Sequence, residues 1–246
     1  MNIGDFSRQA DAYERSRPGY PLDFFKRLMI LAEVEPGDLV ADVGAGTGIS
    51  TRLLSGLGLH VTAIEPNASM RAKGNDSRAT WVDGTFESTG LPDASQDWTV
   101  AAQAFHWADV PRALPEMRRI LQPGRLFTML WNDRAMEHSE VLRWTSEAIQ
   151  RHVPEFDEAY RNRPWDEILE STGDFQFVQK DSELHIVPMS RERFLDLWKS
   201  HNRLNNIAGP ERFESFHSEL LNYLVEHRID TIDVAYHCQA WSARSL

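Results

Sequence analysis

The sequence predicts an α/β fold built on a parallel sheet, and three observations support this. Short apolar runs alternate with amphipathic stretches through the first half of the chain, as in consecutive βα units. The first apolar run leads directly into a loop with three alternating glycines, Gly44, Gly46 and Gly48. The length of 246 residues suits one large α/β domain with additional helices.

Five strands are expected before residue 134, separated by helices. The strands are predicted at 39–44, 60–66, 80–84, 97–105 and 125–133. The helices are predicted at 21–34, 48–58, 67–75 and 110–124, the last ended by Pro123 and Gly124. Asn67 has the side chain of an N-cap residue for the helix at 67–75.

After Asp133 longer helical stretches dominate. Helices are predicted at 139–153, 164–174, 190–204 and 209–227, with a sixth strand or strand pair at 175–187 and a closing strand at 233–243. In an open parallel sheet, ligands bind outside the carboxyl ends of the strands. The insertions at 135–165 and 190–228 have chain positions that suit a helical cap over that crevice.

Composition restricts the class of partner. The formal net charge of −11 argues against nucleic acid and against a membrane surface, both of which favour basic proteins. No apolar stretch approaches the ~20 residues of a membrane span, and the polar N-terminus lacks the apolar core of a signal peptide. The single cysteine, Cys238, fits a reducing compartment. We therefore expect a cytoplasmic protein, monomer or homodimer, whose partner is a small molecule.

The glycine loop fits two kinds of cofactor differently. A dinucleotide fingerprint requires its third glycine where this chain has Ile49. Asp42, two residues before the first glycine, would repel a pyrophosphate but could hold an ammonium group, directly or through water. Glu65, at the end of the second strand, can accept hydrogen bonds from both hydroxyls of a ribose. Because NAD and S-adenosylmethionine both contain ribose, Glu65 does not distinguish them.

The segment QAFHWAD, residues 103–109, follows the fourth strand and is typical of the edge of a binding site. Gln103 is an amide directly after an apolar strand and needs hydrogen-bond partners. Phe105 and Trp107 can present aromatic faces to a cation. His106 has an ordinary pKa near neutrality, so it could act as a base, hydrogen-bond a substrate or serve a structural role.

Taken together, VADVGAGTG (40–48), Glu65, residues 83–109 and LQPGRLFTMLWNDR (121–134) resemble a class I S-adenosylmethionine-dependent methyltransferase. More narrowly, they resemble the trans-aconitate methyltransferase-like branch, which is methyltransferase type 11-like. This branch opens with a segment similar to YERSRPGYP (13–21) and carries an Ala-x-His-Trp element. The resemblance implies a Rossmann-like seven-stranded sheet with the last strand antiparallel.

The resemblance also implies which residues hold the cofactor. Expected contacts of S-adenosylmethionine, and of its product S-adenosylhomocysteine, come from the N-terminal segment and four strand ends: Tyr13, Arg17, Gly44, Ala45, Gly46, Glu65, Pro66, Met70, Thr85, Phe86, Gln103, Ala104 and Phe105. Glu65 would hold the ribose, Thr85 and Phe86 would lie at the adenine, and Gln103 would lie beneath the methionyl end. No metal site is expected, since the histidines form no HExxH motif and none pairs with the cysteine.

The acceptor site is expected to use residues that follow these strands, the N-terminal segment and a late helix. The candidates are Tyr20, His106, Trp107, Trp131, Asn132, Trp198 and His201, with His106 the candidate catalytic residue. Residues 1–34 would form an N-terminal flap and first helix, 35–134 the cofactor-binding core, and 1–246 together a single domain. Arg134 could pair with a substrate carboxylate.

The function expected from these features is transfer of a methyl group from S-adenosylmethionine to a small organic acceptor. The accepting atom could be a carboxylate, hydroxyl, amine or activated carbon. Two alternatives stay open from the sequence. The same fold and cofactor could serve a non-methylating reaction such as cyclisation, or the chain could be a nicotinamide-dependent oxidoreductase.

Overall fold

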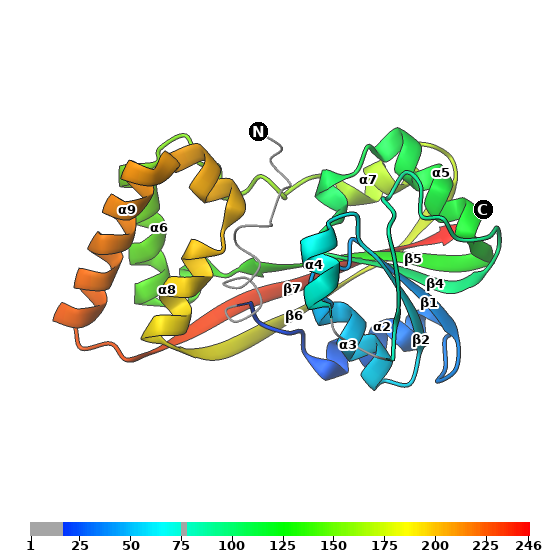
Figure 1. Ribbon diagram of the computed structural model, residues 1–246, viewed down its shortest axis with the longest axis horizontal. Helices are drawn as coiled ribbons and strands as arrows, with labels where there is room; N and C mark the ends of the chain where they lie inside the picture. Colours follow the sequence, from blue (N-terminus) through cyan, green and yellow to red (C-terminus); the bar gives the residue numbers. More distant parts are fainter. Residues whose placement is uncertain (1–16, 75–77) are drawn as a thin grey trace. The chain divides into compact units, whose positions relative to one another are not determined.

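The computed structural model describes residues 17–74 and 78–246. Seven strands form one sheet in the order β3-β2-β1-β4-β5-β7-β6, and the last strand is antiparallel (Figure 1). The strands are β1 (Leu39–Val43), β2 (His60–Ile64), β3 (Thr80–Val82), β4 (Gln96–Ala102), β5 (Leu121–Arg134), β6 (Phe175–Ser190) and β7 (Thr231–Ser245). The expected seven-stranded methyltransferase sheet is therefore confirmed.

The first five strands are parallel and place their carboxyl ends at one edge. β1 pairs with β2 and with β4, β2 pairs with β3, and β4 pairs with β5, all in parallel register. The central residues of β1, β4 and β5 are buried, as expected for the inner strands of a parallel sheet. The order reverses between β1 and β4, which is the position where α/β sheets bind ligands.

The chain divides into two compact units. The sheet unit comprises 19–132, 163–183 and 238–246, and the helical unit comprises 1–18, 133–162 and 184–237. Three of the five divisions fall within β5, β6 and β7, so these strands contribute residues to both units.

In the sheet unit, helices cover the sheet on both faces. Figure 1 shows α5 (Val110–Ile120) and α7 (Trp165–Glu170) above it and α2 (Leu22–Ala32) and α3 (Ile49–Gly56) below it. α4 (Ala68–Lys73) follows β2. The core under α5 and α7 is rich in aromatic rings: Trp131 stacks on Trp165 at 4.6 Å, and Phe105 contacts Phe127 edge to face.

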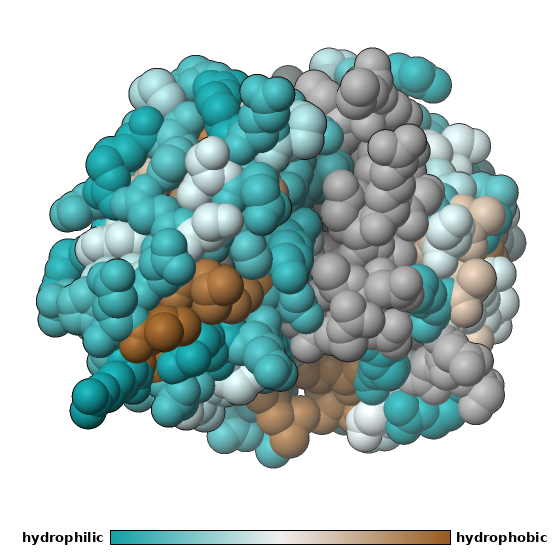
Figure 2. Space-filling model, turned by 60° about the vertical axis from the view of Figure 1, so that its left-hand side comes forward, coloured by the Kyte–Doolittle hydropathy of each residue, from teal (hydrophilic) through white to brown (hydrophobic). Residues whose placement is uncertain are grey.

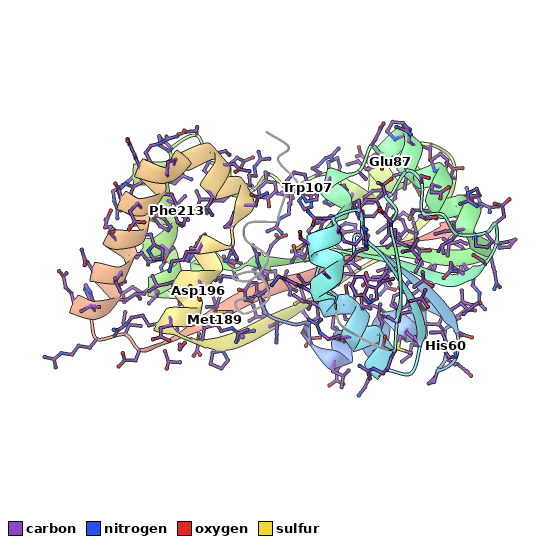
Figure 3. All side chains as sticks on the ribbon, in the orientation of Figure 1. His60, Glu87, Trp107, Met189, Asp196 and Phe213 are labelled. Carbon is purple, nitrogen blue, oxygen red and sulfur yellow. The ribbon has the colours of Figure 1, made fainter. Side chains whose placement is uncertain are left out.

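The helical unit contains the three long helices of the second half. α6 (Glu140–His152), α8 (Arg191–Lys199) and α9 (Asn202–Glu226) pack on one another, with α9 contacting both partners. Ser139 and Ser190 cap α6 and α8 through their hydroxyl groups. Figure 3 labels Asp196 on α8 and Phe213 on α9.

Several expected boundaries change in the structure. α5 ends at Ile120, because Leu121 turns to extended backbone, so Pro123 and Gly124 lie in β5 and do not end the helix. The segment expected as one strand or a pair at 175–187 is one strand, β6. β4 ends at Ala102, and Phe105–Trp107 form a short 3-10 turn where the fourth strand was expected to continue.

None of the helices in 17–74 and 78–246 has the length and apolar character of a membrane-spanning segment. The described residues on the face drawn in Figure 2 are largely hydrophilic, with small separate apolar patches. This agrees with the charged content of the sequence, which has 37 Asp and Glu residues and 26 Lys and Arg residues.

Candidate functional site

The glycine loop between β1 and α3 lies against the ends of the neighbouring strands. The amides of Gly44 and Ala45 both donate to the carbonyl of Ile64, at 2.8 and 3.0 Å. Gly44 has φ +73°, and a Cβ atom placed there would lie 2.5 Å from the Cβ of Ala104. The backbone can pass this close to Ala104 only because residue 44 is glycine.

Glu65 is fixed at the end of β2 by two backbone amides. Its Oε2 accepts from the amide of Gly46 and its Oε1 from the amide of Asn67, each at 2.9 Å. The side chain is buried, and this desolvation raises its pKa. The two amide hydrogen bonds set the orientation of the carboxylate before any ligand binds. Its remaining lone pairs can accept hydrogen bonds from further donors.

Asp42 lies fully buried in β1 beside the loop. Its Oδ2 accepts from the hydroxyls of Ser50 and Thr51 in the first turn of α3, at 2.8 and 2.6 Å. Its Oδ1 is buried and has no hydrogen-bond partner in the described part of the chain. Burial raises the pKa of Asp42 to about 6. The orphaned oxygen is a vacant acceptor for a positively charged donor or a water.

The segment after β3 brings an aromatic ring to the loop. Thr85 and Ser88 pair across a tight turn, and Phe86 is buried with its ring near the position that a Gly44 Cβ would take. Phe86 meets Phe105 edge to face at 5.4 Å. Phe105 is completely buried in the aromatic core, so its ring packs against Phe86 and does not line the loop itself.

Gln103 and Asn132 form a polar node at the ends of β4 and β5. Gln103 has φ +60°, an uncommon conformation for a residue with a side chain, and its Nε2 donates to the carbonyl of Asn132 at 3.1 Å. Asn132 in turn donates to the carbonyl of Gly19 and accepts from the thiol of Cys238. Gln103 therefore has the partners that its position required, and the buried thiol is one support of the node.

His106 is oriented by a tryptophan of β5. The indole Nε1 of Trp131 donates to the Nδ1 of His106 at 3.3 Å. Because an indole can only donate, Nδ1 is unprotonated, and the neutral ring carries its proton on Nε2. Trp107 lies beside the imidazole at 4.7 Å and is exposed. Glu87 and Trp107, both labelled in Figure 3, come from the segments that follow β3 and β4.

Glu65, Phe86 and Ala104 all lie against the glycine loop. The other residues expected at the cofactor or acceptor lie in different surroundings. Met70 is buried in α4, and its Cε would lie 3.6 Å from a Cβ at Gly46. Pro66 is exposed beside Glu65. Tyr20 packs against Phe25 at 5.3 Å. Tyr13 lies outside the described residues.

Three expected site residues belong to the helical unit. The guanidinium of Arg17 donates to the carbonyl of Ser200 at 3.3 Å. Trp198 and His201 stack on each other with ring centroids 6.0 Å apart. The Nδ1 of His201 accepts from the amide of Leu204, so His201 caps α9. Burial lowers the pKa of His201 well below its ordinary value, which keeps the ring neutral.

The structure also shows residues that the sequence did not single out. Ser50 and Thr51 hold Asp42, and the backbone of Asn67 holds Glu65. The hydroxyl pair directly after the glycine loop was a usable signal, because small hydroxyl residues in a first helical turn commonly bond to a nearby acid. Tyr160 and Tyr236, which lie with Arg134 in the helical unit, carry no local motif.

The fold and the site define a class: the seven-stranded sheet is a Rossmann-like methyltransferase fold with a glycine loop and an acidic residue at the end of β2. Residues 41–129 match the family Methyltransf_11, described as a methyltransferase domain. The match covers the region in which the loop, Glu65, Phe86 and Gln103 lie.

Curated relatives share the same region. An uncharacterized methyltransferase of Mycobacterium tuberculosis is 38% identical over 144 residues, which are 58% of this chain and 56% of the relative. A malonyl-[acyl-carrier protein] O-methyltransferase of Serratia marcescens is 30% identical over 156 residues, covering 61% of this chain and 60% of that protein. The chain thus spans somewhat more than half the length of these two relatives.

A third relative is covered over more of its length. An uncharacterized methyltransferase of Geobacillus thermodenitrificans is 30% identical over 157 residues, which are 59% of this chain and 72% of that protein. Together with the match over residues 41–129, this similarity shows that the chain belongs to the methyltransferase family.

Solved structures resemble the chain over most of its length. A candidate type II methyltransferase from Anaeromyxobacter dehalogenans superposes with a TM-score of 0.67 and 24% identity, covering 93% of this chain and 97% of that chain. Phosphoethanolamine N-methyltransferase 2 of Haemonchus contortus, solved with phosphomonomethylethanolamine and S-adenosylhomocysteine, has a TM-score of 0.51 and 19% identity. That match covers 100% of this chain and 60% of that chain. At these identities the similarity shows the fold.

Proposed function

We propose that the chain is an S-adenosylmethionine-dependent methyltransferase that acts on a small organic acceptor. The observation that carries the proposal is the buried Glu65 carboxylate, fixed by the amides of Gly46 and Asn67 beside the glycine loop. Such a carboxylate can accept both hydroxyls of a ribose. The methyltransferase match over 41–129 and the shared fold support the same conclusion.

The residues around Glu65 fit the rest of this cofactor. The amino-acid end of S-adenosylmethionine carries an ammonium, and the orphaned Oδ1 of Asp42 is a suitable acceptor, directly or through a water. A pyrophosphate would instead be repelled by Asp42, which disfavours a dinucleotide. Phe86 and Thr85 would lie at the adenine, and Gly44, Ala45, Gln103 and Ala104 at the methionyl end. A neighbour of the same fold holds S-adenosylhomocysteine.

When bound, S-adenosylmethionine supplies an electrophilic methyl group on a cationic sulfur. The chain's own residues then need to align the acceptor and exclude water, since the transfer is an in-line displacement. Trp107 is exposed and can wall the acceptor. Trp131, which was expected at the acceptor, is instead buried in the aromatic core and acts through its hydrogen bond to His106. Asn132 holds Gln103 in its strained conformation.

His106 acts in this proposal as a hydrogen-bond donor to the acceptor. Its Nδ1 is engaged by Trp131, so its Nε2–H faces away from that bond as a donor. A donor orients an acceptor atom that is already nucleophilic, such as a carboxylate oxygen, and removes no proton from it. A carboxyl acceptor is consistent with the O-methyltransferase relative from Serratia marcescens.

The direct test is turnover. The protein is incubated with S-adenosylmethionine and, in parallel, small carboxylates, alcohols and amines, and S-adenosylhomocysteine is quantified with the methylated product. We expect stoichiometric formation of both with carboxylates. Acceptor conversion without S-adenosylhomocysteine would indicate a non-methylating use of the same cofactor. Turnover with a nicotinamide cofactor instead would overturn the assignment.

The role of His106 is tested with two variants that each keep one ring function. Gln in place of His106 keeps a donor near the Nε2 position, and Asn keeps an acceptor near the Nδ1 position. We expect His106→Gln to retain most of the kcat/KM and His106→Asn to lose about tenfold or more, the loss of one charge-assisted hydrogen bond. Neither amide is a base, so a large loss of kcat/KM in both variants would assign His106 to proton abstraction.

A further inference from the structure

Arg134 carries an enclosed guanidinium in the helical unit. It ends β5, and its guanidinium carbon lies 4.3 Å from the centre of the Trp198 ring. Its Nε and Nη2 atoms are enclosed and have no hydrogen-bond partner in residues 17–74 and 78–246. Arginine stays protonated in proteins, so these donors cannot be removed by losing a proton. Enclosed charged donors without an acceptor are rare in native proteins and call for a physical explanation.

Other guanidiniums add positive charge around Arg134. Burial, together with the charges of Arg17 and Arg161, lowers the pKa of Arg134 to about 10. Arg161 pairs with Asp133 at 2.6 Å, which accounts for one carboxylate near this cluster. The positive charge of these guanidiniums favours an anion at Arg134.

The groups around Arg134 are neutral and aromatic. Trp198 provides the face on which the guanidinium lies, and His201 is kept neutral by burial and by the same three arginines. Tyr236 is buried near Arg134, and burial raises the pKa of its hydroxyl, which therefore stays protonated. The site thus joins positive donors and a neutral hydroxyl to ring faces, which suits an organic molecule with an anionic end.

We propose that Arg134 anchors a binding site for an oxyanion, a carboxylate or phosphate group carried by a small organic molecule. The planar guanidinium fork matches the two oxygens of such a group, and the enclosed Nε and Nη2 atoms form one edge of that fork. Arg17 and Arg161 strengthen the attraction by their charge. In a protein of net charge −11, this cluster of guanidiniums is a local concentration of positive charge. The inference deepens the proposed function and rests on it in one respect: the anionic molecule is taken to be the methyl acceptor.

The first experiment measures anion binding by the full chain. Inorganic phosphate and citrate, a tricarboxylate, are titrated by calorimetry and by thermal unfolding, with chloride at matched ionic strength as the control. We expect saturable binding of phosphate or citrate, with a rise in Tm that chloride does not give. The stronger of the two identifies phosphate or carboxylate as the preferred group. No saturable binding of either would overturn the proposal.

Variants then assign the binding to Arg134. Arg134→Met removes the charge and keeps an apolar chain against Trp198, and Arg134→Lys keeps the charge without the fork. The matched control is Arg151→Met, because Arg151 also lies over a tryptophan of this unit, Trp144 at 5.4 Å, but pairs with Glu219. We expect anion affinity to fall about tenfold or more in Arg134→Met, to be intermediate in Arg134→Lys and to be unchanged in Arg151→Met.

Stability without anions separates ligand binding from a structural role. Replacing an unpartnered buried charge by an apolar chain is neutral or stabilising, so Arg134→Met should keep or raise the Tm in anion-free buffer. A lower Tm there would show that the chain itself satisfies Arg134.

Asp5, Asp11 and Glu14 lie outside the described residues. Anion binding seen only after their neutralisation by Asn and Gln would assign the site to an internal carboxylate and contradict the proposal.

Titration of S-adenosylhomocysteine into the same variants keeps the two proposals apart. Anion binding lost in Arg134→Met, with nucleoside affinity unchanged, supports the oxyanion site. Anion binding without any nucleoside binding would uphold the oxyanion site and reject the methyltransferase. Nucleoside binding without anion binding would reject the oxyanion site and leave the methyltransferase assignment standing.

Discussion

Gly44 is a residue whose replacement is costly both by contact and by backbone conformation. A Cβ atom at this position would lie 2.5 Å from the Cβ of Ala104 and 3.1 Å from the Phe86 ring, and φ is +73°. Overpacking and a left-handed backbone conformation add, so we expect Gly44→Ala to lower the free energy of unfolding by about 2–4 kcal/mol. Urea unfolding measures this loss.

Gly124→Ala is the matched control for Gly44→Ala. Gly124 has φ +77°, close to that of Gly44, but nothing lies within 4 Å of its Cβ position. We expect a loss of about 1 kcal/mol there, from the backbone alone. Equal losses at the two glycines would show that the contact with Ala104 carries no weight.

Asp42 predicts an unusual pH dependence. Burial raises its pKa from 3.8 to about 6, so the folded state binds a proton more tightly than the unfolded state. The free energy of unfolding therefore falls as pH rises from about 4 to 6, by up to about 3 kcal/mol from this group. Below pH 4 the contribution is fully present, and above pH 6 it is lost.

The variant Asp42→Asn separates stability from binding. Asn keeps one oxygen to accept from Ser50 and Thr51 but cannot ionise. We expect it to remove the decline between pH 4 and 6, giving a variant at least as stable as wild type at pH 7. Its affinity for S-adenosylhomocysteine should nevertheless fall about tenfold, since the ammonium loses a charged acceptor. An unchanged slope between pH 4 and 6 would contradict the assignment.

The positions of single residues were predictable to different degrees. Glu65 and the glycines were predictable because a parallel sheet places them at one edge and the backbone there has few alternatives. The tautomer of His106 was not predictable, since it depends on Trp131, a residue 25 positions away along the chain. Phe105 was expected to face the cofactor but lies in the aromatic core, because the 3-10 turn after β4 directs its ring inward.

At the scale of elements, α4 links helix stability to the site. The side chain of Asn67 accepts from the amides of Ser69 and Met70, as the sequence predicted, and its backbone amide donates to Glu65. We expect Asn67→Ala to cost about 1 kcal/mol of stability through the lost cap, and to weaken S-adenosylhomocysteine binding because Glu65 loses a support. Thermal unfolding and calorimetry measure the two effects.

Ser139→Ala is the control for this cap. Ser139 caps α6 by accepting from the amide of Leu142, and α6 belongs to the helical unit. A similar loss of stability is expected, with no change in nucleoside affinity. If both variants weakened the nucleoside equally, the effect at Asn67 would be one of general stability.

The break in α9 is a second feature at this scale. Two separate helices were predicted, at 190–204 and 209–227, whereas the structure has α8 ending at Lys199 and α9 running from Asn202 to Glu226 through a kink. The Gly209–Pro210 pair marks the kink, and Gly209 has φ 70° and ψ 170°. The sequence located the break correctly but misplaced the helix start, because the capping role of His201 has no strong sequence signal.

Gly209→Ala tests whether the kink is needed. No atom lies within 4 Å of its Cβ position, so the cost is backbone conformation alone, about 1–3 kcal/mol. The opposite sign is expected for Gly56→Ala, at the end of α3, where nothing crowds the Cβ position and alanine favours the helix. Thermal unfolding of both variants provides the comparison.

For the whole molecule, the sheet unit was far more predictable than the helical unit. Strands and glycine loops have local signals, and the order of βα units restricts the topology to few choices. The cluster around Arg134 combines side chains from positions 17, 134, 161, 198 and 236. No local pattern connects positions so far apart, and only the packing of α6, α8 and α9 with the strand ends determines it.

The cofactor assignment is tested by calorimetric titration of S-adenosylhomocysteine, with NADH as the control, into wild type and Glu65→Gln. Gln preserves the shape of Glu65 and one of its acceptors, so the variant tests the carboxylate itself. We expect micromolar binding to wild type, about −8 kcal/mol, binding about tenfold or more weaker to the variant, and no binding of NADH. Binding of NADH without binding of S-adenosylhomocysteine would contradict the assignment of the cofactor.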